Sequence, residues 1–161
     1  MKRWGSLLLF LLLVIVVSWW GSRFHPGEWY YGLTKPAWNP PSWVFGPVWS
    51  LLYVMMAVAA WQVWNSEHER RLPAITLWLV QLVLNGAWSW LFFGLHRPGI
   101  AMFELAALLS VVIATTALFN VIRRSAALLM LPYVLWLMFA LALNVALWKL
   151  NGGGLSTLTG G

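Results

Sequence analysis

Five apolar runs divide the chain, and each has about the length that a helix needs to cross a lipid bilayer, roughly 20 residues. They cover residues of about 4–20, 44–64, 73–93, 99–121 and 126–148. Apart from the first, the connections between them are too short to hold a second folded domain. We therefore expect an all-α integral membrane protein with a single transmembrane domain, 1–161, built as a bundle of five transmembrane helices.

The composition agrees with a surface that faces lipid. Hydrophobic residues make up 61% of the sequence and charged residues 9%, whereas a soluble domain carries about 25% charged residues. The chain has 14 tryptophans, and membrane interfaces favour tryptophan because its ring is apolar while its N–H needs a polar partner. Water is therefore not the main solvent of this surface.

The first apolar run permits two interpretations. Lys2 and Arg3 precede it, as basic residues precede the apolar region of a signal peptide. However, the bulky side chains of Trp19 and Trp20 stand where a cleavage site requires small residues. We expect a retained transmembrane span.

Basic residues lie between the apolar runs and predict the orientation of the chain. Six of the ten Lys and Arg residues lie at the N-terminus and in the 65–72 and 122–125 connections, on one side of the membrane. The other four lie on the opposite side, so the positive-inside rule favours a cytoplasmic N-terminus and an external C-terminus. The Gly-rich segment 150–161 has no apolar pattern and is expected to be a flexible tail.

The sequence lacks the residues that several classes of function require, among them acid–base catalysis, metal binding and nucleic-acid binding. The chain has no cysteine, and no catalytic Ser-His-Asp set, carboxylate pair, metal-binding cluster or phosphate-binding glycine loop can be assembled. His25, His68 and His96 fall in or beside loops, so no axial haem ligand is expected inside the bundle. No basic stripe interleaved with aromatic residues suggests a nucleic-acid partner. The pattern favours a binding protein over an enzyme, without a metal or a required cofactor.

Polar and aromatic residues share faces on three of the expected helices. The three stripes, at helical spacing, are Trp49 and Tyr53; Gln81, Asn85 and Trp88; and Tyr133, Trp136, Ala140 and Asn144. One interpretation is that the polar side chains only join helices, at about 0.6 kcal/mol for each hydrogen bond. Because three helices each offer such a stripe, we favour a shared interior pocket, in which small Ala140 leaves space for a flat ligand.

Glu104 is the acidic residue that falls within an expected span. Ionisable residues inside a membrane are candidates for proton or ion transfer. Glu104 follows Gly99 by five residues, so the alternative is a position near the interface and the positive end of the helix.

The first loop and the second span carry a recognisable motif, "GLTKPAWNPPSWVFGPVWSLLY", over residues 32–53. It resembles the signature of the translocator protein family, which includes the bacterial tryptophan-rich sensory proteins (TspO) and the mitochondrial peripheral-type benzodiazepine receptor. The segments "GSRFHPGEWYYGL", "QLVLNGAW", "FFG", "ATT" and "LPYVLWLMFALALN" resemble further family motifs in the same order. The resemblance extends from about residue 21 to 150.

This resemblance implies a five-helix bundle, commonly a homodimer, in which the long first loop acts as a lid over a pocket. The implied ligands are porphyrins such as protoporphyrin IX, haem and, in some members, sterols. Carried over position by position, the family's pocket residues fall on Trp29, Tyr30, Trp38, Pro40, Trp49, Tyr53, Asn85, Trp88, Trp136, Ala140 and Asn144. The three helical stripes include seven of them.

The first loop has a composition that suits a lid. Pro36, Pro40 and Pro41 make it stiff, so less entropy is lost when it closes over a ligand. Charge alone suggests that Lys35 or Arg23 meets a porphyrin propionate, and that Glu28 holds one of these cations when no ligand is bound.

The functional expectation is therefore porphyrin binding for sensing, sequestration or transport. One alternative is light-dependent oxidative breakdown of protoporphyrin IX, for which the resemblance implicates Trp49 and Trp136. Another is transport of a sterol or other small molecule, but Val145 replaces the tyrosine of the family's sterol pattern, although Lys149 is present. This departure also favours a bacterial cell membrane, inner or outer. No small-xxx-small repeat marks the third span, so the homodimer rests on the resemblance alone.

Overall fold

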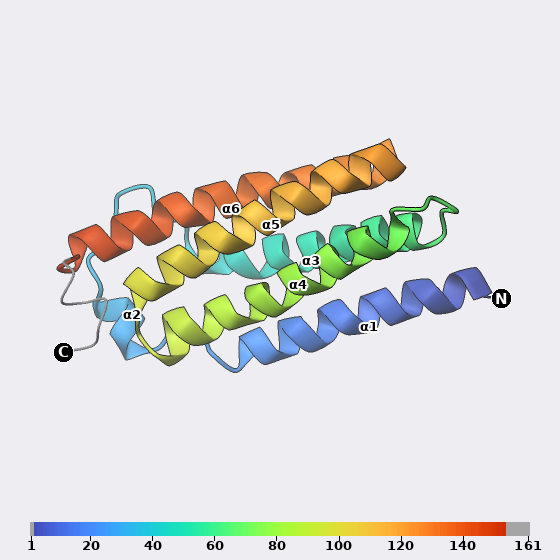
Figure 1. Ribbon diagram of the computed structural model, residues 1–161. Helices are drawn as coiled ribbons and strands as arrows, with labels where there is room; N and C mark the ends of the chain where they lie inside the picture. Colours follow the sequence, from blue (N-terminus) through green and yellow to red (C-terminus); the bar gives the residue numbers. More distant parts are fainter. Residues whose placement is uncertain (1, 154–161) are drawn as a thin grey trace.

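The computed structural model describes residues 2–153, and within this range the chain is helical without any strand. The elements are α1 (Lys2–Ser22), α2 (Glu28–Gly32), α3 (Ser42–Trp64), α4 (Arg71–Ser89), the π-helical turn η1 (Trp90–Gly94), α5 (Pro98–Ile122) and α6 (Arg124–Leu150) (Figure 1). Five of them, counting α4 with η1 as one, are long and apolar enough to cross a membrane. The all-α, five-helix prediction is therefore confirmed.

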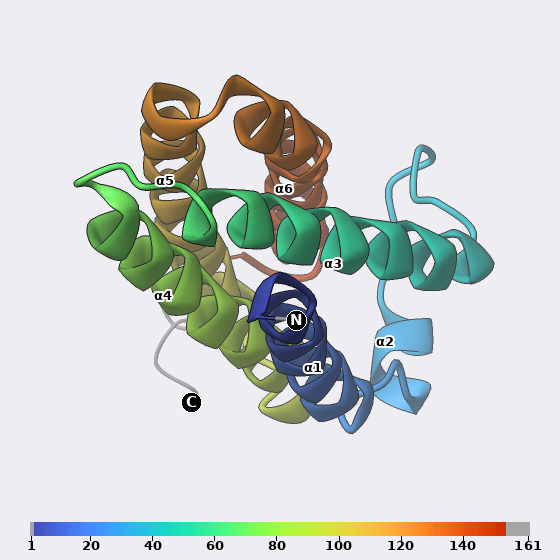
Figure 2. The same cartoon turned by 90° about the vertical axis from the view of Figure 1, so that its right-hand side faces the viewer.

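The five long helices pack side by side into one bundle. The α5 helix packs against α6 and α4, while α1 packs against α3 and α4. Viewed from the N-terminal end, α3 runs between α1 and α6 (Figure 2). Fully buried alanines on α3, Ala57 and Ala60, let neighbouring backbones approach closely, as small residues do in membrane bundles.

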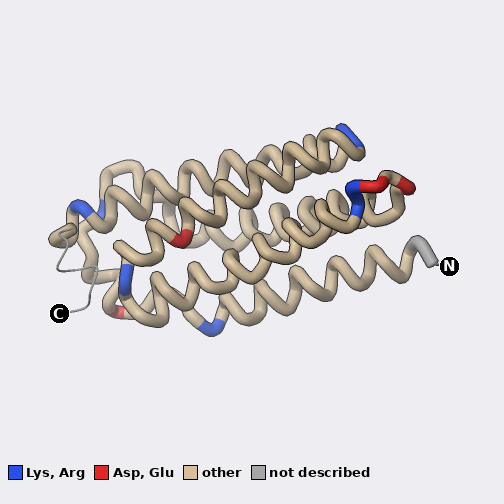
Figure 3. Tube along the Cα trace, viewed as in Figure 1, with Lys and Arg blue, Asp and Glu red and all other residues tan. Residues whose placement is uncertain are grey.

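Apart from Glu104 within α5, the charged residues lie toward the two ends of the bundle (Figure 3). At one end, the α3–α4 and α5–α6 connections and the first residues of α4 and α6 carry Arg70, Arg71, Arg123 and Arg124, with Glu67 and Glu69. Toward the other end, the first loop, the connection before α5 and the last turn of α6 carry Arg23, Lys35, Arg97 and Lys149, with Glu28. Helix α1 begins at the first end and α6 ends at the second, as an odd number of spans requires. Between the ends, the outward faces are apolar: on α1, for example, Leu12, Ile15 and Val16 are exposed. The chain is a multi-pass integral membrane protein.

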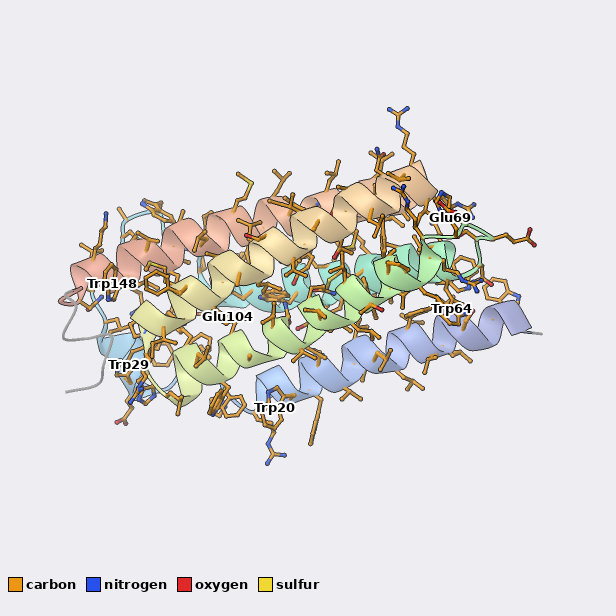
Figure 4. All side chains as sticks on the ribbon, in the orientation of Figure 1. Trp20, Trp29, Trp64, Glu69, Glu104 and Trp148 are labelled. Carbon is orange, nitrogen blue, oxygen red and sulfur yellow. The ribbon has the colours of Figure 1, made fainter. Side chains whose placement is uncertain are left out.

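Tryptophans mark both ends of the apolar zone. Figure 4 shows Trp64 near one end of the bundle and Trp29 and Trp148 near the other. At the first end the Arg71 guanidinium lies over the Trp64 ring, 5.2 Å from its centroid. This placement is the one that interface-seeking tryptophans adopt in membrane proteins.

The first loop, residues 23–41, includes the short helix α2 and lies at one end of the bundle (Figure 1). Ring contacts attach it to the rest of the bundle: Trp29 stacks on His96 at 4.4 Å, Tyr30 meets Phe93 edge to face, and Trp38 meets Phe139 in the same way. Of the predicted flexible tail, Leu150 belongs to α6, and residues 154–161 lie outside the described residues.

Candidate ligand pocket

A pocket of about 420 Å³ lies between the helices in the half of the bundle next to the first loop. Residues from every long helix line it, together with Phe24, His25, Pro26 and Tyr30 from the first loop. Its volume falls in the range of about 300–1,000 Å³ that is typical of small-molecule sites. The bundle therefore encloses a site of ligand size.

Eight of the eleven residues expected at a pocket line this one. They are Tyr30, Trp49, Tyr53, Asn85, Trp88, Trp136, Ala140 and Asn144. The other three lie elsewhere in or beside the first loop. Trp29 stacks on His96, Trp38 is 49% exposed, and Pro40 accepts a hydrogen bond from Asn39 Nδ2.

Aromatic rings form two walls of the pocket. On α3 and α6, the Trp49 and Trp136 rings meet edge to face with centroids 6.5 Å apart, and Tyr53 lies beside Trp49 at 5.5 Å. On α4 and η1, Trp88 stacks on Phe92 at 5.1 Å. Such walls offer large apolar area and ring faces to a flat aromatic ligand.

A chain of hydrogen bonds joins three helices behind the first wall. The Tyr53 hydroxyl of α3 donates to Asn85 Oδ1 of α4 at 2.6 Å, and Asn85 Nδ2 donates to the Tyr133 hydroxyl of α6 at 2.9 Å. The Tyr133 hydroxyl then donates to Gln81 Oε1 at 3.1 Å. Tyr133 and Gln81 are fully buried and do not line the pocket. For these two residues the helix-joining interpretation is the right one.

A second amide joins the other wall to the start of α5. Asn144 Oδ1 accepts a hydrogen bond from Trp88 Nε1 at 3.2 Å, and Asn144 Nδ2 donates to the Pro98 carbonyl at 2.8 Å. The side-chain amides of Asn85 and Asn144 thus both form hydrogen bonds to neighbouring helices. They hold the aromatic walls in place, and the pocket surface that remains is mostly apolar.

The pocket lining contains no Lys, Arg, Asp or Glu. Lys35 Nζ instead donates to the carbonyls of Tyr31 and Leu33, at 3.2 and 3.1 Å, and lies 4.7 Å from the centroid of the Tyr30 ring. Arg23 lies over the Trp19 ring at 5.2 Å. Neither forms a salt bridge with Glu28 in the described part of the chain, where Arg70 and Glu69 make the one ion pair. Glu28 therefore holds neither cation, contrary to the expectation from charge.

The first loop contributes a neutral phenol to the pocket. Tyr30 is 6% exposed, and its hydroxyl donates to Asn39 Oδ1 at 3.5 Å, the outer limit of a hydrogen bond. Burial raises the pKa of Tyr30 above its usual value, while the bond to Asn39 acts in the opposite direction. The phenol therefore stays protonated at neutral pH.

Sequence reasoning missed His25 and the phenylalanines of the pocket. His25 lies in the first loop, as expected, yet it lines the pocket. Phe45 precedes Trp49 by one helical turn, a spacing that predicts a shared face. Phe92 and Phe93 belong to the "FFG" motif, and the wider turn of η1, closed by a bond from Leu95 N to the Trp90 carbonyl, brings both to the pocket.

Gly94, the last residue of the "FFG" motif, has too little space around it for a side chain. A Cβ at this position would lie 2.9 Å from Cδ1 of Phe24 and 3.1 Å from Cδ1 of Trp90. Phe24 is one of the loop residues that line the pocket. The missing side chain of Gly94 therefore lets the first loop pack closely on η1.

Glu104 lies beside the pocket but does not line it, although its neighbour Leu105 does. Both carboxylate oxygens are buried, and neither has a hydrogen-bond partner among the described residues. Figure 4 shows the residue on α5 between the two ends of the bundle. The structure thus places Glu104 within a span and gives it no partner within hydrogen-bond distance for a proton relay.

The exposed part of the pocket lining lies on α1, α3 and the first loop. On the two helices it consists of Ser18, Ser22, Ser42, Gly46 and Ser50. The Ser22 and Ser50 hydroxyls donate to carbonyls of their own helices, at 2.7 and 2.9 Å. Because these two hydroxyls need no water, this exposed part of the lining suits a surface that faces lipid.

Comparison with known proteins identifies relatives over most of the chain. A sequence model described as the TspO/MBR family matches residues 7–149. Protein CrtK of Rhodobacter capsulatus is 42% identical over 135 residues, covering 83% of this chain and 84% of its own. The human Translocator protein is 40% identical over 139 residues, covering 83% and 82%. Tryptophan-rich protein TspO of Chlorobaculum tepidum is 36% identical over 155 residues, covering 93% and 98%.

Proposed function

This chain belongs to the TspO/MBR family, and on that premise we propose that it binds a porphyrin, protoporphyrin IX or haem, in the pocket between its helices. Its role is to sense, sequester or move the porphyrin within the membrane of a bacterial cell. The observation that carries the proposal is the pocket itself: about 420 Å³, walled by Trp49, Trp136 and Trp88, and free of charged side chains.

The aromatic walls supply the affinity for a flat apolar ring. Trp49 and Trp136 contact one part of the ligand and Trp88 another, while Ala140 leaves the space between them open. Burial of apolar surface contributes about 25 cal/mol per Å², so a ring held between such walls gains several kcal/mol. In this proposal the uncharged lining accepts the macrocycle and not its carboxylates.

The carboxylates of the ligand lie toward the end where the first loop lies. In the described part of the chain, the connections and helix ends on that side carry Arg23, Lys35, Arg97 and Lys149 against the one acidic residue Glu28. Its positive potential attracts carboxylates without a specific ion pair. His25, at the same end, is the lining residue that offers an imidazole to them.

A dark titration with protoporphyrin IX, followed by tryptophan fluorescence, tests the proposal. Saturable binding is expected, and Ala140→Leu should weaken it about tenfold or more, because the larger side chain fills the space for the ring. Ala142→Leu is the matched control, since Ala142 is exposed on the same helix and does not line the pocket. The proposal fails if the protein shows no saturable binding, or if both substitutions weaken binding equally.

Light-dependent breakdown of the porphyrin is the second candidate. The observation that favours it is that Trp49 and Trp136 lie 6.5 Å apart at an interplanar angle of 87°, and both line the pocket. A ring bound there contacts both indoles, so a photo-oxidation that needs no acid or base has two oxidisable neighbours. Illumination in air distinguishes the candidates: faster loss of porphyrin absorbance than in detergent, slowed by Trp136→Phe, supports breakdown. A constant absorbance supports a carrier or sensor.

Sterol binding has no such support. Val145 stands where the sterol pattern needs a tyrosine, and it does not line the pocket. The homodimer stays a prediction from the family, and cross-linking of the purified protein in nanodiscs would test it.

A further inference from the structure

The end of α6 is joined to the first loop by a pair of hydrogen bonds. The Thr34 backbone N–H donates to Asn151 Oδ1 at 2.8 Å, and Asn151 Nδ2 donates to the Thr34 carbonyl at 2.9 Å. The side-chain amide thus pairs with the backbone of Thr34 much as one peptide group pairs with another in a sheet. These two bonds tie the segment that follows α2 to the end of a membrane-spanning helix.

The backbone after α6 is shaped to hold Asn151 at that place. Asn151 caps the helix, and its Nδ2 also donates to the Leu147 carbonyl at 2.8 Å. Gly152 follows in the left-handed region, at φ +85°. A Cβ on Gly153 would lie 2.8 Å from the Trp148 carbonyl oxygen. The two glycines therefore end the helix sharply, directly after the residue that contacts the loop.

The anchored point controls a wall of the pocket. Thr34 follows α2 by two residues, and α2 carries Tyr30, which lines the pocket. Lys35 Nζ closes the turn between them, since it donates to the carbonyls of Tyr31 and Leu33. Thr34 is thus linked to Tyr30 by one short, hydrogen-bonded segment, and the Tyr30 ring meets Phe93 edge to face.

The other attachments of the loop are of a different kind. Trp29 on His96 and Trp38 on Phe139 are ring contacts, which tolerate sliding. Hydrogen bonds are directional, so the Asn151–Thr34 pair selects one position of the loop. Thr34 is exposed, so water competes for both bonds and they hold the loop without locking it.

We propose that Asn151 is a latch: a positioning residue that holds the first loop closed over the end of the pocket, so that its release limits the exchange of ligand. The ligand readout rests on the proposed function, whereas the latch itself does not. Asn151 does not itself line the pocket and acts through Thr34 and α2.

The first test needs no ligand. Amide hydrogen exchange is measured on the full chain in nanodiscs, over the peptide that contains α2 and Thr34. Asn151→Ala should raise exchange there roughly tenfold, because two surface hydrogen bonds are lost. Asn151→Asp, which keeps the acceptor for the Thr34 N–H and loses the donor, should fall between Ala and the native residue. Unchanged exchange in Asn151→Ala overturns the latch.

Asn65→Ala is the matched control. Asn65 caps α3 at the opposite end of the bundle, and its Nδ2 donates to the Trp61 carbonyl at 2.8 Å, the same capping bond that Asn151 makes to Leu147. Its other partner is Ser6, and it contacts no part of the first loop. Exchange at Thr34 should not change in this variant; an equal rise would mean that general loosening, and not the latch, is measured.

The second test measures the dissociation rate of protoporphyrin IX in the dark. Asn151→Ala should raise both the association and the dissociation rate by about the same factor, with little change in affinity, and Asn65→Ala should change neither. If exchange at Thr34 rises but the dissociation rate does not, the ligand leaves past the exposed lining on α1 and α3 and the gating role is wrong. If no porphyrin binds to any variant, the proposed function fails. The amide hydrogen exchange at Thr34 then decides by itself whether Asn151 holds the loop.

Discussion

The two halves of the bundle are made of the same apolar helices but are packed in opposite ways. In the closed half, toward the N-terminus of α1, small and large residues fill the interior: Ala57, Ala60, Trp78 and Met130 are all fully buried. In the pocket half, toward the first loop, large rings line a space of about 420 Å³ and leave it open. Hydrophobicity therefore decides that the helices enter the membrane, but the sizes and polar groups of the facing side chains decide whether an interior is filled.

Polar groups explain how the open half keeps its shape. Asn85 of α4 forms hydrogen bonds to Tyr53 of α3 and Tyr133 of α6. Asn144 of α6 forms hydrogen bonds to Trp88 of α4 and to the carbonyl of Pro98 at the start of α5. In the closed half complementary side chains pack directly, and side-chain bonds between helices, such as Ser125 Oγ to Gln62 Oε1 at 2.6 Å, lie near the helix ends. The comparison predicts that matched substitutions have opposite effects in the two halves.

The largest effect is expected from removing a ring in each half. Trp78 is fully buried and meets Phe10 edge to face at 5.2 Å, so Trp78→Ala should lower the free energy of unfolding by about 3–5 kcal/mol. Trp136→Ala should cost clearly less, because one face of that ring already borders a cavity. Denaturant unfolding in detergent measures both, and equal losses would contradict the difference between the halves.

The next effect comes from adding volume. Ala60→Leu in the closed half should cost about 1–3 kcal/mol of stability through overpacking. Ala140→Leu should change stability little, since its methyl groups enter the cavity, while it weakens porphyrin binding. Thermal unfolding of the ligand-free variants measures the contrast. A large loss of stability in Ala140→Leu would show that its surroundings are as tightly packed as those of Ala60.

A smaller effect separates the helix-joining polar groups from the pocket surface. Tyr133→Phe removes hydrogen bonds to Asn85 and Gln81 and should cost about 1 kcal/mol. Because Tyr133 does not line the pocket, porphyrin affinity should stay within about twofold. The same titration on Tyr53→Phe, which alters the lining, provides the comparison. A tenfold loss of affinity in Tyr133→Phe would place the buried chain of hydrogen bonds in direct control of the ligand.

The smallest effect is expected from the surface charge near the pocket. Arg23→Ala should change porphyrin affinity by less than about threefold, and the change should vanish at high salt, because Arg23 is exposed and lies over Trp19. Titrations at low and high ionic strength measure it. A loss of affinity that persists in high salt would mean that Arg23 pairs directly with a carboxylate of the ligand.

The helices show how much of the site follows from spacing along the chain. Seven residues from the three helical stripes line the pocket, because helical periodicity places residues i, i+3 and i+4 on one face whatever the rest of the fold does. The same rule applies to Phe45, which shares a face with Trp49 and was overlooked. The loop residues follow no such period. Tyr30 lines the pocket, Trp29 and Trp38 brace the loop from outside, and Lys35 closes a turn where charge alone suggested a ligand contact.

The sequence by itself determined the five spans, the family and the inward faces of the helices, since all three depend on patterns that repeat along one chain. Only the tertiary structure decided which polar groups pair with each other, which half of the bundle stays open and where the first loop is fastened. Those outcomes depend on groups far apart in sequence, such as the Thr34 backbone and the Asn151 side chain, or the side chains of Tyr53 and Asn85. Their pairing is a matter of distance and direction in space, which no local pattern contains.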